Sequence, residues 1–107
     1  MNRLTMLPNE WVITINGDIV TGLDAESYIH LETVGSVSTL SFVTRRPTPT
    51  IARLFSLFET VTPFNAVLTN LANGATHTLP RAMIQRAPTD DGQLLSWAVI
   101  TGELKSR

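Results

Sequence analysis

Two histidines, His30 and His77, are the residues of this sequence best suited to acid–base chemistry or metal binding. Metal-binding histidines usually stand in short spacings such as His-Glu-x-x-His, and these two lie far apart in the chain. There is no cysteine to supply a thiolate ligand or nucleophile. A two-histidine site completed by carboxylates stays open as an alternative, but hydrogen-bonded strand histidines are the favoured interpretation. We therefore expect no metal and no cofactor.

Two acidic pairs, Asp24 with Glu26 and Asp90 with Asp91, are the next candidates for chemistry. Catalytic carboxylates are brought together across a cleft by the fold, so nearness in sequence carries little weight. Both pairs fall in or beside expected turns, where aspartate accepts hydrogen bonds from the local backbone. The serines lack a Gly-x-Ser-x-Gly elbow, and no glycine-rich loop leads into Lys-Ser or Lys-Thr. The sequence predicts that the protein is not an enzyme.

The basic residues are few and are mostly arginine. Eight Lys and Arg residues stand against nine Asp and Glu residues, a net charge of −1. A phosphate backbone therefore has no electrostatic reason to bind the whole surface, and we expect no direct specific nucleic-acid binding. Arg45 and Arg46 are adjacent, and arginine favours specific paired contacts. They are candidates for contact with an acidic partner surface, with a solvated loop as the ordinary interpretation.

The elements that position these residues begin with the segment "WVITINGDIV", residues 11–20. Trp11, Ile13 and Ile15 alternate with more polar positions, as in a half-buried strand. Asn16-Gly17 suits the positive φ angles of a two-residue type I′ turn. The pattern predicts a β-hairpin.

A second hairpin is expected around Gly35. "ESYIHLETV" places Ile29 and Leu31 on one face, and "SVSTLSFVT", residues 36–44, places Leu40 and Phe42 on one face. Tyr28 is the one aromatic residue expected on a polar face. The opposite side of the later strand holds Val37, Thr39, Ser41 and Val43. Its serine and threonine content suits a solvent-exposed or partner-facing surface.

The spacing of apolar residues changes from the alternation of a strand to that of a helix over "RRPTPTIARLFSLFETVTPF". Thr48 can cap a helix with Pro49 at its first position, and the helix should end near Thr60. Apolar residues recur at helical spacing and predict an inward-facing stripe, widened by Leu57. The stripe consists of Ile51, Leu54, Phe55 and Phe58.

Residues 63–72 fit two interpretations: a second helix stopped by Asn73-Gly74, or a strand paired with "THTLPRAMIQ". The strand is favoured because Thr76-His77-Thr78 is extended and needs a neighbour. "APTDDGQ" predicts a turn. Residues 94–100 carry apolar residues on both faces, Trp97 among them, which predicts a central strand or one whose second face is covered by a partner.

The whole chain, residues 1–107, is expected to form a single mainly β domain: a small antiparallel β-barrel or sandwich with one amphipathic α-helix packed on it. A hydrophobic content of 43% with 16% charged residues is ordinary for a folded domain. No apolar run approaches the roughly 20 residues of a membrane span, and the first residues do not have the pattern of a signal peptide. We expect no membrane association and assembly in a cytoplasm.

The order of these segments resembles the tail-tube and baseplate-hub module of contractile-tailed bacteriophages, which is similar to the tube protein of type VI secretion systems. The matching stretches are "INGDIVTG", "GSVSTLSF", "TLPRAMIQRAP" and "WAVITGEL". The chain is shorter than usual tube subunits and has little room for the inter-ring loop, so a baseplate or tube-end component is implied as readily as the main tube.

This resemblance implies a structural subunit of the virion tail, assembled in the host cytoplasm. It would form a homo-oligomeric ring and dock onto tube, sheath or baseplate proteins. Candidate subunit contacts are Val37, Thr39 and Ser41 with Arg45 and Arg46. A different class of function stays open: a free oligonucleotide- or ligand-binding β-barrel, which needs exposed aromatic residues beside arginines. The arginines in question are Arg45, Arg46, Arg81 and Arg86.

Overall fold

The computed structural model describes residues 2–45, 49–86 and 95–106, and these residues form nine strands and one helix. In chain order, the elements are β1 (Asn2–Met6), β2 (Trp11–Ile15), β3 (Asp18–Ile19), β4 (Ile29–Val34), β5 (Val37–Arg45), α1 (Pro49–Glu59), β6 (Phe64–Asn70), β7 (Thr76–Arg86), β8 (Leu95–Gly102) and β9 (Lys105–Ser106). The expectation of a mainly β fold with one helix is confirmed.

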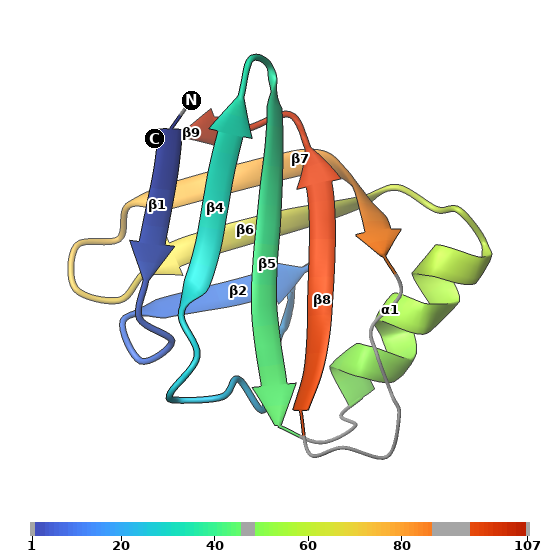
Figure 1. The fold of residues 1–107 in the computed structure, drawn as a ribbon, viewed down its shortest axis with the longest axis horizontal. Coiled ribbons are helices and arrows are strands. Elements are labelled where there is room, and N and C mark those ends of the chain that lie inside the picture. The colour runs from blue at the N-terminus through green and yellow to red at the C-terminus, as the bar shows by residue number, and fades with distance from the viewer. Residues whose placement is uncertain (1, 46–48, 87–94, 107) are drawn as a thin grey trace.

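The strands form one antiparallel sheet folded into two layers. Along the sheet the order is β1-β4-β5-β8-β7-β6-β2-β3, and β9 pairs with β7. Figure 1 shows β1, β4, β5 and β8 side by side in front, with β7, β6 and β2 running across behind them. The sheet does not close into a barrel, so β1 and β3 are its two ends.

β7 belongs to both layers, because it pairs with β6 and β9 in one and with β8 in the other. Its register with β6 shifts between the pairs Phe64–Ala82 and Ala66–Leu79. Pro80 lies within this irregularity, where a residue without an N–H donor is tolerated. The bend lets one strand pass from the rear layer to the front layer.

The first hairpin forms as the sequence predicts. β2 and β3 pair around Asn16-Gly17, whose φ angles of 50° and 85° are the left-handed values that a type I′ turn requires. The side chains of Asp18 in β3 and Arg53 in α1 form an ion pair. The second hairpin, β4–β5, turns through Gly35, also at positive φ.

The core fills the space between the layers, and α1 covers its right-hand end in Figure 1. Leu54 of α1 is fully buried, and Leu57 packs against the same cluster. The expectation that Phe58 faces inward is wrong: in the last turn of the helix this side chain is 41% exposed. Buried apolar residues from the strands complete the core: Met6, Ile13, Ile15, Ile29, Leu31, Leu40, Phe42, Phe64, Ala66, Leu68, Leu79, Ala82 and Ile100.

The ambiguous segment, residues 63–72, contains strand β6, which pairs with β7 as favoured. β8 lies between β5 and β7, so its prediction as a central strand is confirmed. β1 and β9 were not expected from the sequence. Several predictions fall outside the described residues: the cap Thr48, the turn at 87–93 with Asp90 and Asp91, and Arg46. The structure also does not describe four side chains named above, those of Ile51, Phe55, Arg86 and Trp97.

Candidate functional site

The outward side of β5 is the surface on which the candidate contact residues Val37, Thr39 and Ser41 lie. Burial alternates along this strand: Leu40 and Phe42 face the core, and the residues between them are less buried. Val37 is 53% exposed. We call Val37, Thr39, Ser41 and Val43 the outer face of β5. The alternation that the sequence predicts for this strand is confirmed.

Both backbone edges of β5 are occupied by neighbouring strands. Thr39 pairs with Glu32 of β4 and Thr101 of β8, and Ser41 pairs with His30 and Val99. A partner can therefore contact β5 only through side chains of its outer face. In the part of the chain that the structure describes, the nearest strand with a free backbone edge is β1, which pairs there with β4 alone.

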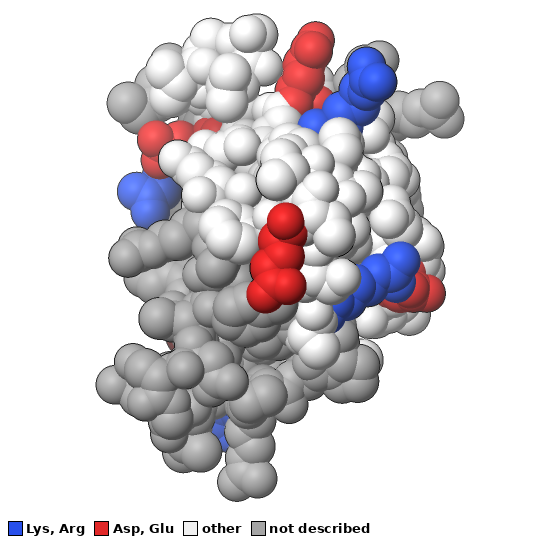
Figure 2. Space-filling view, turned by 90° about the vertical axis from the view of Figure 1, so that its right-hand side faces the viewer, with Lys and Arg blue, Asp and Glu red and all other residues white. Residues whose placement is uncertain are grey.

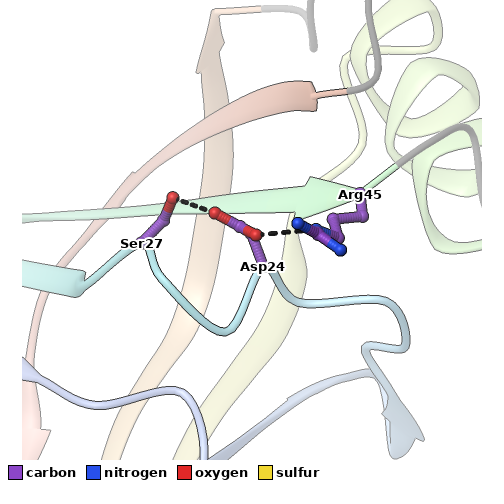
Figure 3. Close-up of polar contacts among 3 residues, drawn as sticks. All are labelled: Asp24, Ser27 and Arg45. Carbon is purple, nitrogen blue, oxygen red and sulfur yellow. Dashed lines mark hydrogen bonds and ion pairs between the residues drawn. The ribbon is translucent and has the colours of Figure 1, made fainter.

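Arg45, the last residue of β5, is held by Asp24 of its own chain. The Arg45 Nε donates to Asp24 Oδ1 at 2.9 Å. The Ser27 hydroxyl donates to the other carboxylate oxygen, so Asp24 lies between the two partners, as Figure 3 shows. The Asp24 side chain is 7% exposed and that of Arg45 is 67% exposed. A buried carboxylate is thus paired with a cation that reaches solvent.

Backbone hydrogen bonds bring Asp24 to this place. The segment before it runs antiparallel to the end of β5, with Leu23 opposite Thr44. The Asp24 N–H donates to the Val43 carbonyl at 2.9 Å, and the Arg45 N–H donates to the Gly22 carbonyl at 2.6 Å. The ion pair therefore connects the β3–β4 segment to the end of β5.

The pKa of the Asp24 carboxyl lies below its ordinary value of 3.8. The main cause is the hydrogen bond from Ser27, and those from Arg45 and the Glu26 backbone act in the same direction, whereas burial acts in the opposite direction. The carboxylate is therefore charged at neutral pH. The turn role expected for Asp24 is confirmed by its bonds to Ser27 and Glu26. The ion pair with Arg45 was not expected, and it means that an exchange of Arg45 also disturbs the fold.

Of the two side-chain contacts of Asp24, the sequence indicates the one with Ser27 but not the one with Arg45. Asp24 and Ser27 are three residues apart, a spacing at which an Asp side chain and a Ser hydroxyl meet in a turn. Arg45 lies 21 residues further along the chain than Asp24, and their meeting depends on the Leu23–Thr44 bridge. No local pattern predicts such a pairing.

The two histidines lie on different strands and have different partners. His30 of β4 accepts a long bond at its Nδ1 from Arg3, at 3.4 Å, and its ring lies 6.5 Å from that of Tyr28. His77 of β7 stacks on Trp11, with ring centroids 5.4 Å apart. Tyr28 is 52% exposed, as expected. Within residues 2–45, 49–86 and 95–106, no group of three or more His, Asp or Glu side chains is placed to hold a metal ion.

A hollow of about 240 Å³ opens beside Tyr28 and the outer face of β5. Its lining combines apolar, hydroxyl and titratable side chains, and its Ser27 is the residue that bonds Asp24. The lining residues are Glu26, Ser27, Tyr28, His30, Ser41, Phe42 and Val43. This hollow and the exposed guanidinium of Arg45 therefore lie at the same end of β5.

Charges are dispersed on the side of the molecule seen in Figure 2, where acidic and basic residues are interspersed among uncharged areas. Arg81 on β7 is exposed. No helix in the described part of the chain has the length and apolar content needed to cross a bilayer.

No protein-family model matches the sequence, and no curated protein matches it either.

Proposed function

We propose that this chain is a structural subunit of a bacteriophage tail, in a baseplate, tube-end or tube ring, and acts by self-association and docking onto other tail proteins. The observation that carries the proposal is the open sheet, whose terminal strand β1 pairs on one side only within the described residues. An unpaired strand edge is a template for pairing with another chain.

Two features of β1 suit it to that role. Natural sheets protect their edges with proline, charged side chains or bulges. The five residues Asn2–Met6 contain no proline, carry one charged residue, Arg3, and pair with β4 in unbroken register. Leu4 is 36% exposed. The outer face of β5 lies two strands away in the same layer and adds hydroxyl and apolar side chains. The resemblance to tail-tube modules supplies the assignment to a phage tail, as an analogy of pattern.

A free ligand-binding domain is the second candidate function. The hollow beside Tyr28 and His30 favours it, because an exposed aromatic ring and an imidazole suit a planar ligand. Titration with single-stranded DNA at low and high salt tests this candidate. Absence of binding at low salt would remove the oligonucleotide version.

Light scattering coupled to size-exclusion chromatography tests the structural proposal, together with electron microscopy of particles that contain the protein. We expect a concentration-dependent oligomer and a location in the virion tail. A bulky charge on the outer face of β5, Thr39→Arg, should weaken assembly. Thr69→Arg is the matched control, because Thr69 is also a half-buried threonine with a paired strand on each side. A monomer at all concentrations that is absent from virions would refute the proposal.

A further inference from the structure

The end of α1 holds Val61 in a conformation that valine rarely adopts. Its φ angle is 50°, in the left-handed region that favours glycine. The Val61 N–H donates to the Phe58 carbonyl at 3.2 Å, and the Thr62 N–H donates to the Leu57 carbonyl at 3.1 Å. These two bonds form a Schellman motif, in which the residue at the Val61 position is usually glycine or asparagine.

Packing within the chain does not explain this valine, because its side chain is 69% exposed. A β-branched residue at positive φ is strained, and glycine in its place would remove the strain. The sequence instead keeps an apolar side chain in solvent at a strained position. Backbone strain of this kind is a reason to look for a function.

Two neighbours of Val61 are also locally unfavourable. Phe58 is 41% exposed. Glu59 is exposed at the carboxyl end of the helix, where the helix dipole is negative, and the last turn contains no basic residue. A partner that supplies an apolar contact and a positive charge would cover the Phe58 and Val61 side chains and pair with Glu59, which gives the strained valine a function. We call Phe58, Glu59 and Val61 the α1 tip.

We infer that the α1 tip docks onto a second copy of this chain, in the hollow beside Tyr28 with Arg45 at its side. The hollow offers Tyr28 and Val43 for apolar contact, and its volume of about 240 Å³ exceeds the ~150 Å³ that accommodates a benzene ring. Within the described residues, Asp24 is the one ion-pair partner of Arg45, and the Arg45 side chain is 67% exposed. No other partner of its N–H donors lies in the described part of the chain, and we assign these donors to Glu59 of the other copy.

This contact joins two different surfaces, so it is a head-to-tail interface, which generates rings or filaments rather than closed pairs. It rests on the proposed function, since it specifies how the subunits associate. Glu26 and His30 also line the hollow, so the approaching Glu59 meets the Glu26 carboxylate as well as the Arg45 guanidinium. The Arg45 guanidinium is the group that we expect to decide the charge preference.

Val61→Gly is the sharpest test, because stability and assembly should change in opposite directions. Relief of strain should outweigh the added freedom of glycine in the unfolded chain and raise the melting temperature of the subunit by roughly 4–8 °C. Loss of the apolar contact should weaken self-association at least about tenfold. Val61→Asn tests the same point without the added flexibility of glycine. A lower melting temperature with unchanged association would show that Val61 is a structural residue only.

Disulfide trapping locates the contact, because the sequence has no cysteine of its own. Phe58→Cys mixed with Ser41→Cys should form a crosslinked dimer. The matched control is Leu71→Cys mixed with Ser41→Cys, since Leu71 is also apolar and is 61% exposed. Equal crosslinking in both mixtures would overturn the inference while leaving oligomer formation by the unmodified protein intact. A wild-type protein that stays monomeric would instead refute the proposed function itself.

Discussion

Arg45 Nε lies 2.9 Å from Asp24 Oδ1, although the two residues come from different segments of the chain. This pair joins a buried carboxylate to an exposed guanidinium. It is therefore at once a fold-stabilising contact and part of the surface on which we place a subunit contact. Experiments at this position must separate the two roles.

Asp24→Asn should lower the stability of the subunit and remove part of its acid sensitivity. The pKa of the Asp24 carboxyl is lowered in the fold, so its contribution is present above the unfolded value of 3.8 and is lost as pH falls through the folded value. Wild type and variant should differ at pH 7 and converge below pH 3.8. Urea unfolding at several pH values measures this. A constant difference down to the lowest pH would contradict it.

Gly102→Ala should destabilise the fold because the two layers meet tightly at this residue. An added Cβ would lie 3.3 Å from the Ala82 Cα and 3.4 Å from the Leu79 Cβ. Overpacking of this kind costs about 1–3 kcal/mol. The midpoint of thermal unfolding is the measurement. An unchanged midpoint would show that β7 and β8 separate by a few tenths of an ångström without cost.

Leu54→Ala should be among the more damaging substitutions in α1. Leu54 is fully buried, and truncation of a buried leucine costs about 2–5 kcal/mol. Leu71→Ala is the control, because Leu71 is 61% exposed and should change the free energy of unfolding by no more than ~0.5 kcal/mol. Chemical denaturation followed by circular dichroism compares them. Similar effects in both variants would contradict the packing of α1 against the core.

Thr44→Val should stabilise the protein. Thr44 is fully buried, and its hydroxyl has no hydrogen-bond partner in the described part of the chain. Removal of an unsatisfied buried hydroxyl should raise the free energy of unfolding by about 1 kcal/mol. Ser38→Ala is the contrasting variant, because the Ser38 hydroxyl lies 2.7 Å from that of Thr33. Loss of this hydrogen bond should lower the free energy of unfolding by about 1 kcal/mol. A loss of stability in both variants would point to a partner for Thr44.

Hairpins, the helix and the central strand could be predicted because their signals are local. Asn16-Gly17 encodes its turn, and the alternation of Leu40 and Phe42 encodes the inward face of β5. β1 could not be predicted, since its five residues form a strand by pairing with β4, which begins more than 20 residues later. The prediction that Phe58 faces inward was wrong, because helical periodicity assigns a residue to a face of the helix but does not show how far along the helix the core extends.

The candidate site could be predicted only in part, for the same reason. The outer face of β5 follows from alternation along one strand. The pairing of Arg45 with Asp24, the hollow beside Tyr28 and the strain at Val61 depend on contacts between distant segments or on backbone angles. Valine at position 61 gives no sign in the sequence of a left-handed conformation, which the pattern would assign to glycine.

The sharing of β7 between the two layers has a consequence for folding. Half of the eight ladders in the described residues join strands that are not consecutive in the chain, such as β2 with β6 and β5 with β8. The contact order is therefore high, and folding should take milliseconds to seconds. β7 cannot leave one ladder without strain on the other. We therefore expect backbone amides of both layers to exchange with deuterium through one global opening, so that neither layer melts ahead of the other.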